Sequence, residues 1–258
     1  MFNYIRAECY KLLRRKYTYV ALAVMLALET LFVSMFAFHN SHSFETPFSA
    51  AVIMIVELGS IGFCACLITG DIVFGGQYKN STLKNEVSFG LSRTRIYLGK
   101  LIAQTLLSIM YMLIMVGFFV GACAVALPHG IGGFPSDTDA LIIVGYFLAV
   151  GLPLWIGGQA VACMCQFLFQ GEMTSSFAYV GIIFVLNTVV EIAGLLIEGN
   201  VGEFLLKSCS YFPLPMLGAA NSLVGDWNYL GKACGVGLFW LVVSTAAGMY
   251  GFNRKEIK

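Results

Sequence analysis

Charged side chains are scarce in this sequence. Of its 258 residues, 11% are Asp, Glu, Lys or Arg and 59% are hydrophobic. A soluble domain carries roughly 25% charged residues. The shortage of charge excludes an ordinary water-soluble fold and places the chain among proteins that cross a membrane several times.

Sequence signatures of catalysis and of nucleotide binding are also missing. The chain contains no G-x-S-x-G, no H-E-x-x-H and no G-x-x-x-x-G-K followed by Ser or Thr. It therefore lacks a recognisable nucleophile and base for a membrane-embedded enzyme, and it lacks the usual phosphate-binding loop. We predict a protein that is not an enzyme and that needs no cofactor of its own.

Histidine is rare, and the cysteines are poorly placed for metal binding. His39 and His42 lie three residues apart with Glu45 after them, but no other feature supports a site there. Six of the eight cysteines fall in or beside apolar segments, where a thiol behaves as a small hydrophobic group. The two C-x-C pairs place their sulfurs on nearly opposite faces of a helix, so we expect no metal site.

Long apolar segments are what the sequence has in abundance. A transmembrane helix needs about 20 mostly apolar residues. Six windows meet this requirement and predict an all-α polytopic membrane protein, a single transmembrane domain over residues 1–258. The windows are Tyr17–Phe38, Phe48–Gly70, Leu101–Leu127, Ala140–Phe169, Phe177–Ile197 and Ala233–Phe252. Pro153 predicts a kink in the fourth span, and Gly117 with Gly121 would let the third approach a neighbour closely.

The positions of Lys and Arg orient the chain, because basic residues favour the cytoplasmic side. With the N-terminus inside, thirteen of the fifteen Lys and Arg residues fall on the inner side, and only Lys207 and Lys232 fall outside. Both termini and the polar interval Asp71–Lys100 are therefore predicted to be cytoplasmic.

The first 16 residues predict an amphipathic helix in the membrane interface. Its apolar positions recur at helical spacing, and five basic residues surround them. The apolar positions are Phe2, Ile5, Cys9, Leu12 and Leu13. A basic flank that only sets the topology is an alternative, and the two are compatible.

The interval Asp71–Lys100 is the only long polar stretch in the first half of the chain. Within it, Gln77–Phe89 predicts a short amphipathic helix that Gly90 ends. Tyr78, Leu83 and Val87 lie on its apolar side, and Lys79, Asn80, Lys84 and Asn85 lie on its polar side. A helix of this kind either lies on lipid or docks into the cleft of a partner protein, and the pattern alone leaves both open.

The longest outer loop, Glu198–Gly231, is too apolar for a plain solvent loop. Phe204–Leu206 and Tyr211–Leu217 predict short helices interrupted by proline. Non-helical backbone at membrane depth needs cover from protein or from a water-filled cavity. We predict a re-entrant helical hairpin in the outer leaflet between the fifth and sixth spans, with a loosely folded surface loop as the alternative.

Three carboxylates lie inside predicted spans. Glu29 and Glu57 are each nine residues from the outer end of their spans, which places both roughly 14 Å below the outer surface. An ionised group near the bilayer centre costs at least about 3 kcal/mol, so such residues face a protein interior or a wet cavity. Glu29 and Glu57 either line a shared pathway or satisfy each other in the bundle. Glu191 follows Asn187 by one helical turn and lies close to the outer end of its span.

Three short motifs in the first cytoplasmic loop resemble the ABC-2 family of export permeases. They are Tyr78-Lys79-Asn80-Ser81-Thr82-Leu83-Lys84-Asn85, Ser92-Arg93 and Ile96-Tyr97-Leu98-Gly99-Lys100. Six spans, the basic start and the long loop before the last span agree with this resemblance. The sequence departs from the family's pattern at two positions. It has Gln77 where the family commonly has an acid, and Ser81 where the family commonly has glycine.

The resemblance implies a permease that works with a separate ATP-binding subunit, which holds ATP and Mg, and with a second permease chain. Gln166–Ser175 would make a second contact with that subunit. Relatives include bacterial exporters for antimicrobial-peptide immunity and drug efflux, so a hydrophobic, peptide or drug-like cargo crossing the bacterial plasma membrane is expected. The implied coupling residues are Gln77, Tyr78, Lys79, Ser81, Thr82, Leu83, Lys84, Asn85, Ser92 and Arg93. The pathway residues would be Glu29, Glu57, Asn187 and Glu191, and the gate residues Tyr211, Phe212, Pro213 and Pro215.

A proton-coupled secondary transporter that uses Glu29 and Glu57 is the alternative function. Such carriers tend to show internal repeats with paired broken helices, and the sequence shows no such repeat.

Overall fold

The computed structural model describes residues 1–41, 46–75, 77, 82–131, 133–169 and 171–255. All regular structure in these ranges is helical. The α-helices are α1 (Phe2–Arg14), α2 (Lys16–Asn40), α3 (Phe48–Leu58), α4 (Ile61–Phe74), α5 (Thr82–Ser88), α6 (Arg93–Ala126), α7 (Asp137–Leu168), α8 (Glu172–Val180), α9 (Leu186–Leu196), α10 (Asn200–Cys209), α11 (Pro213–Ala219) and α12 (Trp227–Arg254). A π-helical turn, Gly181–Val185, joins α8 to α9, and a 3-10 turn, Ala220–Leu223, follows α11.

The predicted spans are present. Five helical segments in the described ranges are long and apolar enough to cross a membrane, and the pair α3 and α4 makes a sixth if it counts as one span. The five are α2, α6, α7, Met173–Leu196 and α12. Each of the six predicted windows overlaps one of these segments, so the fold class is confirmed at this level.

The second span is not the unbroken helix that its apolar run predicts. The axes of α3 and α4 differ by 61° across a break at Gly59 and Ser60. The buried ring of Phe147, on α7, occupies the space where a Cβ on Gly59 would lie, and Trp155 lies against Gly62 in the same way. The bend between α3 and α4 therefore lies against α7, whose aromatic side chains fill the space beside the two glycines.

Helix α7 is the centre of the bundle, with α12, α3 and α4 packed around it. It continues through Pro153 as one helix. Gly237 of α12 packs directly on the backbone of Pro153, so α12 approaches α7 closely at a position without a Cβ. A Cβ on Gly117 or Gly121 would meet no described atom within 4 Å, so no neighbour in the described part of the chain occupies that space.

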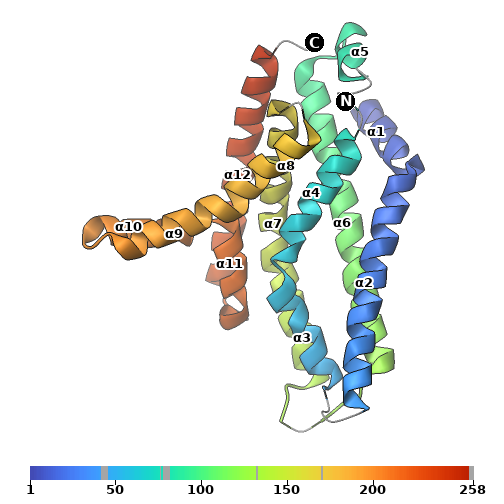
Figure 1. Ribbon diagram of the computed structural model, residues 1–258, viewed down its shortest axis with the longest axis vertical. Helices are drawn as coiled ribbons and strands as arrows, with labels where there is room; N and C mark the ends of the chain where they lie inside the picture. The colour runs from blue at the N-terminus through green and yellow to red at the C-terminus, as the bar shows by residue number, and fades with distance from the viewer. Residues whose placement is uncertain (42–45, 76, 78–81, 132, 170, 256–258) are drawn as a thin grey trace.

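The start of α1, the C-terminal end of α12 and α5 lie at one end of the bundle, and the end of α2, the start of α3, the end of α6 and the start of α7 lie at the other (Figure 1). This arrangement agrees with the prediction that the termini and the polar interval share one side of the membrane. Helices α9 and α10 pack against each other and project sideways from the other helices (Figure 1).

His129 stabilises the loop end of the bundle. Its Nδ1 lies 2.8 Å from Oδ2 of Asp137, and its Nε2 lies 2.9 Å from the carbonyl oxygen of Ala124. Both neighbours are acceptors, and an imidazole donates from both nitrogens only when it is protonated. The Ala124 carbonyl and the Asp137 carboxylate therefore raise the pKa of His129.

We expect this histidine to make thermal stability depend on pH. Because the pKa of His129 is higher in the folded state, protonated His129 adds to the free energy of unfolding. This contribution is complete below the pKa of the unfolded state, about 6.5, and is lost as pH rises through the folded pKa. The Tm difference between wild type and His129→Gln should be larger at pH 5.5 than at pH 8.5. Equal differences at the two pH values would show that folding does not raise the pKa of His129.

Candidate functional site

Helix α5 is anchored by one side and exposed on the other. Leu83 is 2% exposed and belongs to an apolar cluster with Leu12 of α1, Phe74 of α4 and Tyr97 of α6. Lys84 and Asn85 are exposed at the end of the bundle. The predicted apolar and polar sides are therefore found at these positions.

Gly90 ends α5 as predicted. It has φ of +85°, its N–H donates to the carbonyl of Val87, and the N–H of Leu91 donates to that of Glu86. This is the Schellman arrangement, in which glycine takes the left-handed position that other residues disfavour.

The start of the helix differs from the prediction. Helix α5 begins at Thr82, and Gln77 lies in a turn before it, where its side-chain nitrogen donates to the carbonyl of Val73 at 2.7 Å. Ser92 precedes the first residue of α6. Tyr78, Lys79 and Ser81 lie outside the described residues.

A cluster of four charges joins α5 to α1 and α6; we call Tyr4, Glu8, Lys11, Glu86 and Lys100 the charge cluster. Lys100 Nζ lies 3.5 Å from Glu8 Oε2 and 3.6 Å from Glu86 Oε2, and the Lys100 side chain is fully buried. Lys11 Nζ lies 2.7 Å from Glu8 Oε1 and 3.5 Å from Glu86 Oε1. The hydroxyl of Tyr4 donates to Glu86 Oε2 at 2.9 Å. Two ammonium groups thus lie between two carboxylates that come from different helices.

The charge cluster lowers the pKa of Glu8 and raises that of Lys11. Burial alone would raise the pKa of Glu8, but the Lys100 charge and the Lys11 hydrogen bond outweigh it, so the pKa lies below its ordinary value. Burial would lower the pKa of Lys11, and its bonds to Glu8 and Glu86 raise it instead. Breaking a buried pair by removing one partner costs about 3–5 kcal/mol, so the cluster should hold the three helices in one register.

Gly99 lets α1 approach α6 closely. The ring of Tyr4 lies where a Cβ on Gly99 would be, and the next residue is Lys100. Each residue of the Gly-Lys pair before the third predicted span therefore has a physical role. Gly99 leaves room for the ring of Tyr4, and Lys100 supplies the buried charge.

Arg93 ties the segment after α5 to the last helix. Its guanidinium donates to the carbonyl oxygens of Phe252, Asn253 and Lys255 at 2.6, 2.9 and 2.7 Å. The last carbonyls of a helix lack partners within the helix, and a cation there also suits the helix dipole. Arg93 therefore caps the C-terminus of α12.

Two more basic residues at this end cap other helices. The ammonium of Lys255 donates to the carbonyl of Leu168 at 2.6 Å, at the end of α7. The guanidinium of Arg15 donates to the carbonyl of Ile72, at the end of α4. Three of the basic residues on which the predicted orientation rests thus also connect α2, α4, α6, α7 and α12 at the end where α5 lies.

The predicted pathway residues are spread over several elements. Glu29 lies on α2, close to the thiol of Cys123 on α6, and its Oε2 is buried without a hydrogen-bond partner. Glu57 is exposed on α3, which packs against α7 and α6. On α9, Asn187 is 4% exposed and Glu191 is exposed. Glu29 and Glu57 therefore have different surroundings, and α9 projects away from both (Figure 1).

A chain of buried amides crosses the bundle interior. Gln159 Nε2 donates to Thr69 Oγ1 at 3.0 Å, and Gln104 Nε2 donates to Gln159 Oε1 at 2.6 Å. All three side chains are at most 1% exposed. The bonds join α4, α6 and α7, and hydrogen bonds between buried side chains of different helices fix how those helices pack. Sequence inspection missed them, because uncharged amides do not interrupt an apolar window.

The predicted gate segment packs on the bundle. Pro213 is the first residue of α11, the position where proline is best tolerated in a helix, and it is buried. Phe212 lies 5.7 Å from the Trp240 ring of α12, and the Trp240 indole donates to the carbonyl of Tyr211 at 3.2 Å. Pro215 is half-buried within α11, which contacts α7 and α12. The two predicted short helices overlap α10 and α11. Helix α10 packs against α9, and α11 packs against the bundle.

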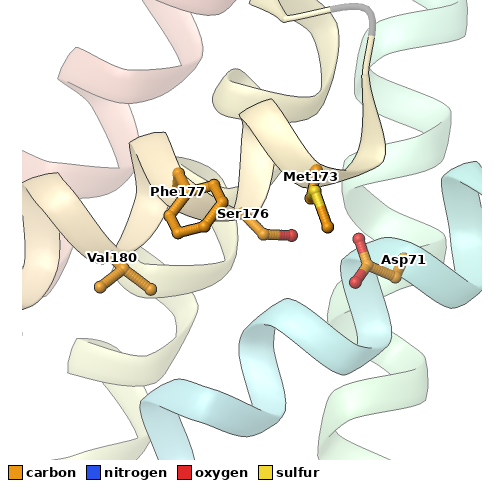
Figure 2. A pocket seen from close by; sticks show the side chains of 5 residues that line it. All are labelled: Asp71, Met173, Ser176, Phe177 and Val180. Carbon is orange, nitrogen blue, oxygen red and sulfur yellow. The ribbon is translucent and has the colours of Figure 1, made fainter.

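A hollow of about 400 Å³ lies between α4 and α8 (Figure 2). Its lining residues are Asp71, Met173, Ser176, Phe177 and Val180. Of its lining residues, Met173 lies within the predicted contact segment Gln166–Ser175.

The helices form a multi-pass membrane protein. At one end, the charge cluster holds α5 to α1 and α6, and α5 exposes polar side chains. The family model of the ABC-2 family transporter proteins matches residues 4–190. The chain belongs to this family: it is a transporter membrane component without an ATPase site, and membership implies an ATP-binding partner subunit. A search of the curated proteins gave no match.

Proposed function

We propose that this chain is the permease subunit of an ABC exporter in the plasma membrane of a bacterium, with both termini in the cytoplasm. A separate subunit binds ATP and Mg, and a second permease chain, of the same or a different kind, completes the pathway. The predicted excess of Lys and Arg at the end that carries the termini supports this orientation.

The anchoring of α5 is the observation that carries the proposal. Lys84 and Asn85 are exposed for contact with a partner, while Glu86 on the same short helix enters the charge cluster. A push on α5 therefore acts on α1 through Glu8 and Lys11 and on α6 through Lys100. A helix that merely lay on lipid would have no need of buried ion pairs to two other helices.

In this mechanism the ATP-binding subunits close on ATP and displace α5, and α1 and α6 tilt with it. The segment Gln166–Ser175, which includes the end of α7 and the start of α8, makes a second contact with the same subunit. Glu29, Glu57, Asn187 and Glu191 line the pathway, and the segment with Tyr211, Phe212, Pro213 and Pro215 acts as the outer gate. The cargo is a hydrophobic, peptide or drug-like molecule, and antimicrobial-peptide immunity is one such role. Membership of the ABC-2 family favours ATP over a proton gradient as the energy source, and so disfavours the proton-coupled alternative.

Reversing the charge of Lys84 tests the docking surface. Lys84→Glu should weaken binding of the ATP-binding subunit about tenfold, or about 1.4 kcal/mol. This is near the low end of the coupling energies of close charge pairs across interfaces. Thermal stability should change little, because Lys84 is exposed. Lys84 is a better probe than Arg93, whose reversal would also remove the cap of α12.

Lys207→Glu is the matched control, since Lys207 is also exposed but lies on α10. Co-purification of the ATP-binding subunit from native membranes should fall for Lys84→Glu and stay at the wild-type level for Lys207→Glu. Equal recovery with both variants would remove α5 from the docking surface.

A further inference from the structure

Helix α1 has one side fixed to the bundle and an opposite side that is exposed. Glu8 and Leu12 are buried, and the hydroxyl of Tyr4 donates to Glu86, so the first side is held against α5 and α6. Along the opposite side, aromatic and arginine side chains alternate at intervals of four residues, which is the spacing of one helix face. These exposed residues, which we call the outer face of α1, are Phe2, Arg6, Tyr10 and Arg14.

The outer face of α1 lies beside the start of a membrane span. Only Arg15, with extended backbone, separates α1 from α2, and α2 is long and apolar enough to cross a membrane. The corner is fixed, because the hydroxyls of Thr18 and Tyr19 donate to the carbonyls of Leu12 and Leu13, each at 2.7 Å. An amphipathic helix at this position lies among the lipid headgroups, and its exposed aromatic rings reach the ends of the acyl chains nearest to them.

The outer face of α1 is positively charged. Glu8 is the only acid of α1, and it is turned inward, where Lys100 Nζ lies 3.5 Å from its Oε2. No ion pair joins Arg6 or Arg14 to a carboxylate in the described part of the chain. The Arg14 guanidinium lies over the Tyr10 ring, 5.0 Å from its centroid, which holds it along the helix. Guanidinium groups bind phosphate oxygens through paired hydrogen bonds, so this face suits a phosphate-bearing surface.

We propose that the outer face of α1 binds anionic phospholipids, with Arg6 and Arg14 on the headgroup phosphates and with Phe2 and Tyr10 beside the acyl chains. Phosphatidylcholine carries a phosphate too, but its choline cation neutralises it, so the face distinguishes lipids by net charge. Bound lipid would hold α1, one of the two helices that the charge cluster joins to α5. The assignment to the inner leaflet rests on the proposed orientation, whereas the binding itself does not.

Native mass spectrometry of the purified full chain tests the proposal, because it resolves each lipid bound to a molecule. The chain is titrated in detergent with phosphatidylglycerol and, separately, with phosphatidylcholine of the same acyl chains. The first phosphatidylglycerol should bind about tenfold more tightly than the first phosphatidylcholine. Arg6→Gln and Arg14→Gln should each weaken phosphatidylglycerol binding about fivefold, the factor for the roughly 1 kcal/mol that one basic residue contributes near an anionic surface. Binding of phosphatidylcholine should stay nearly unchanged.

Two further variants separate a lipid site from a general effect of charge or of folding. Arg95→Gln also removes an exposed arginine, but Arg95 lies on α6 five residues before Lys100, roughly 7.5 Å further toward the end of the bundle where α5 lies. Its phosphatidylglycerol binding should stay at the wild-type level. Arg6→Lys keeps the charge and should retain most of the binding. The Tm of every variant should stay near that of wild type, because the side chains changed are exposed.

Equal binding of the two lipids, undiminished phosphatidylglycerol binding to either glutamine variant of α1, or an equal loss with Arg95→Gln would each overturn the proposal. Binding of soluble glycerophosphoglycerol as tightly as the lipid would also overturn it, because the face would then bind a free phosphate ester rather than a membrane surface. No ATP-binding subunit is present, so these results are independent of the co-purification that tests the proposed function.

Discussion

Replacing Lys100 with Met is expected to lower the free energy of unfolding by about 3 kcal/mol. The substitution leaves the Glu8 and Glu86 carboxylates together with Lys11 as their one remaining cation in the charge cluster. We expect the lower end of the range for broken buried pairs, because Lys11 still lies 2.7 Å from Glu8. Thermal unfolding of the purified chain in one detergent measures the loss.

Lys11→Met is the matched control for Lys100→Met. The Lys11 side chain is 52% exposed, so solvent replaces part of its interaction and the loss should stay below about 1 kcal/mol. Adding Glu86→Gln to Lys100→Met should recover part of the stability, because one cation and one carboxylate then remain. Equal losses for the two lysine variants, or no recovery in the double variant, would mean that Lys100 does not hold the cluster together.

Replacing Gly237 with Ala is expected to destabilise the bundle by about 2 kcal/mol, the middle of the range for overpacked cores. The new methyl group would collide with the carbonyl of Pro153, which is backbone and has no alternative rotamer. Helices α7 and α12 would have to separate along the most extensive contact in the fold. A lower Tm and a lower yield of monodisperse protein should both result.

Gly235→Ala controls for the effect of alanine on the helix itself. A Cβ on Gly235 meets no described atom within 4 Å, and alanine favours a helix over glycine by roughly 1 kcal/mol. Gly235→Ala should therefore be neutral or slightly stabilising. If Gly237→Ala were as stable as Gly235→Ala, the close packing of α12 on Pro153 would be wrong.

The membrane spans could be predicted because hydrophobic length and charge bias are local properties of a sequence. All but the last residue of the window Leu101–Leu127 lies in α6, and Ala233–Phe252 falls within α12. Gly90 was predictable for the same reason, since a glycine after an amphipathic segment is a local signal for a helix end.

The bend between α3 and α4 was not predictable, because it depends on a helix almost 90 residues away. Gly59 and Gly62 resemble the glycines common in membrane helices, and only the positions of Phe147 and Trp155 show why the chain turns there. Gly117 and Gly121, which have the more familiar spacing, face space that no neighbour in the described part of the chain occupies.

The charge cluster was missed for a related reason. Lys100 counts in the sequence as one more cytoplasmic flanking charge, yet its side chain is fully buried. The available signal was the presence of single acids, Glu8 and Glu86, within otherwise basic segments. Each acid needs a cation, but the sequence does not say that both share Lys100 across three helices.

Photo-cross-linking from α5 tests the central claim most directly. A benzoylphenylalanine is placed at Asn85, exposed on α5, or at Glu203, exposed on α10, and native membranes are irradiated before purification. The account predicts a covalent adduct with an ATP-binding subunit from position 85 and none from position 203. Recovery of the intact chain with no ATP-binding protein attached at position 85, or equal adducts from both positions, would contradict it.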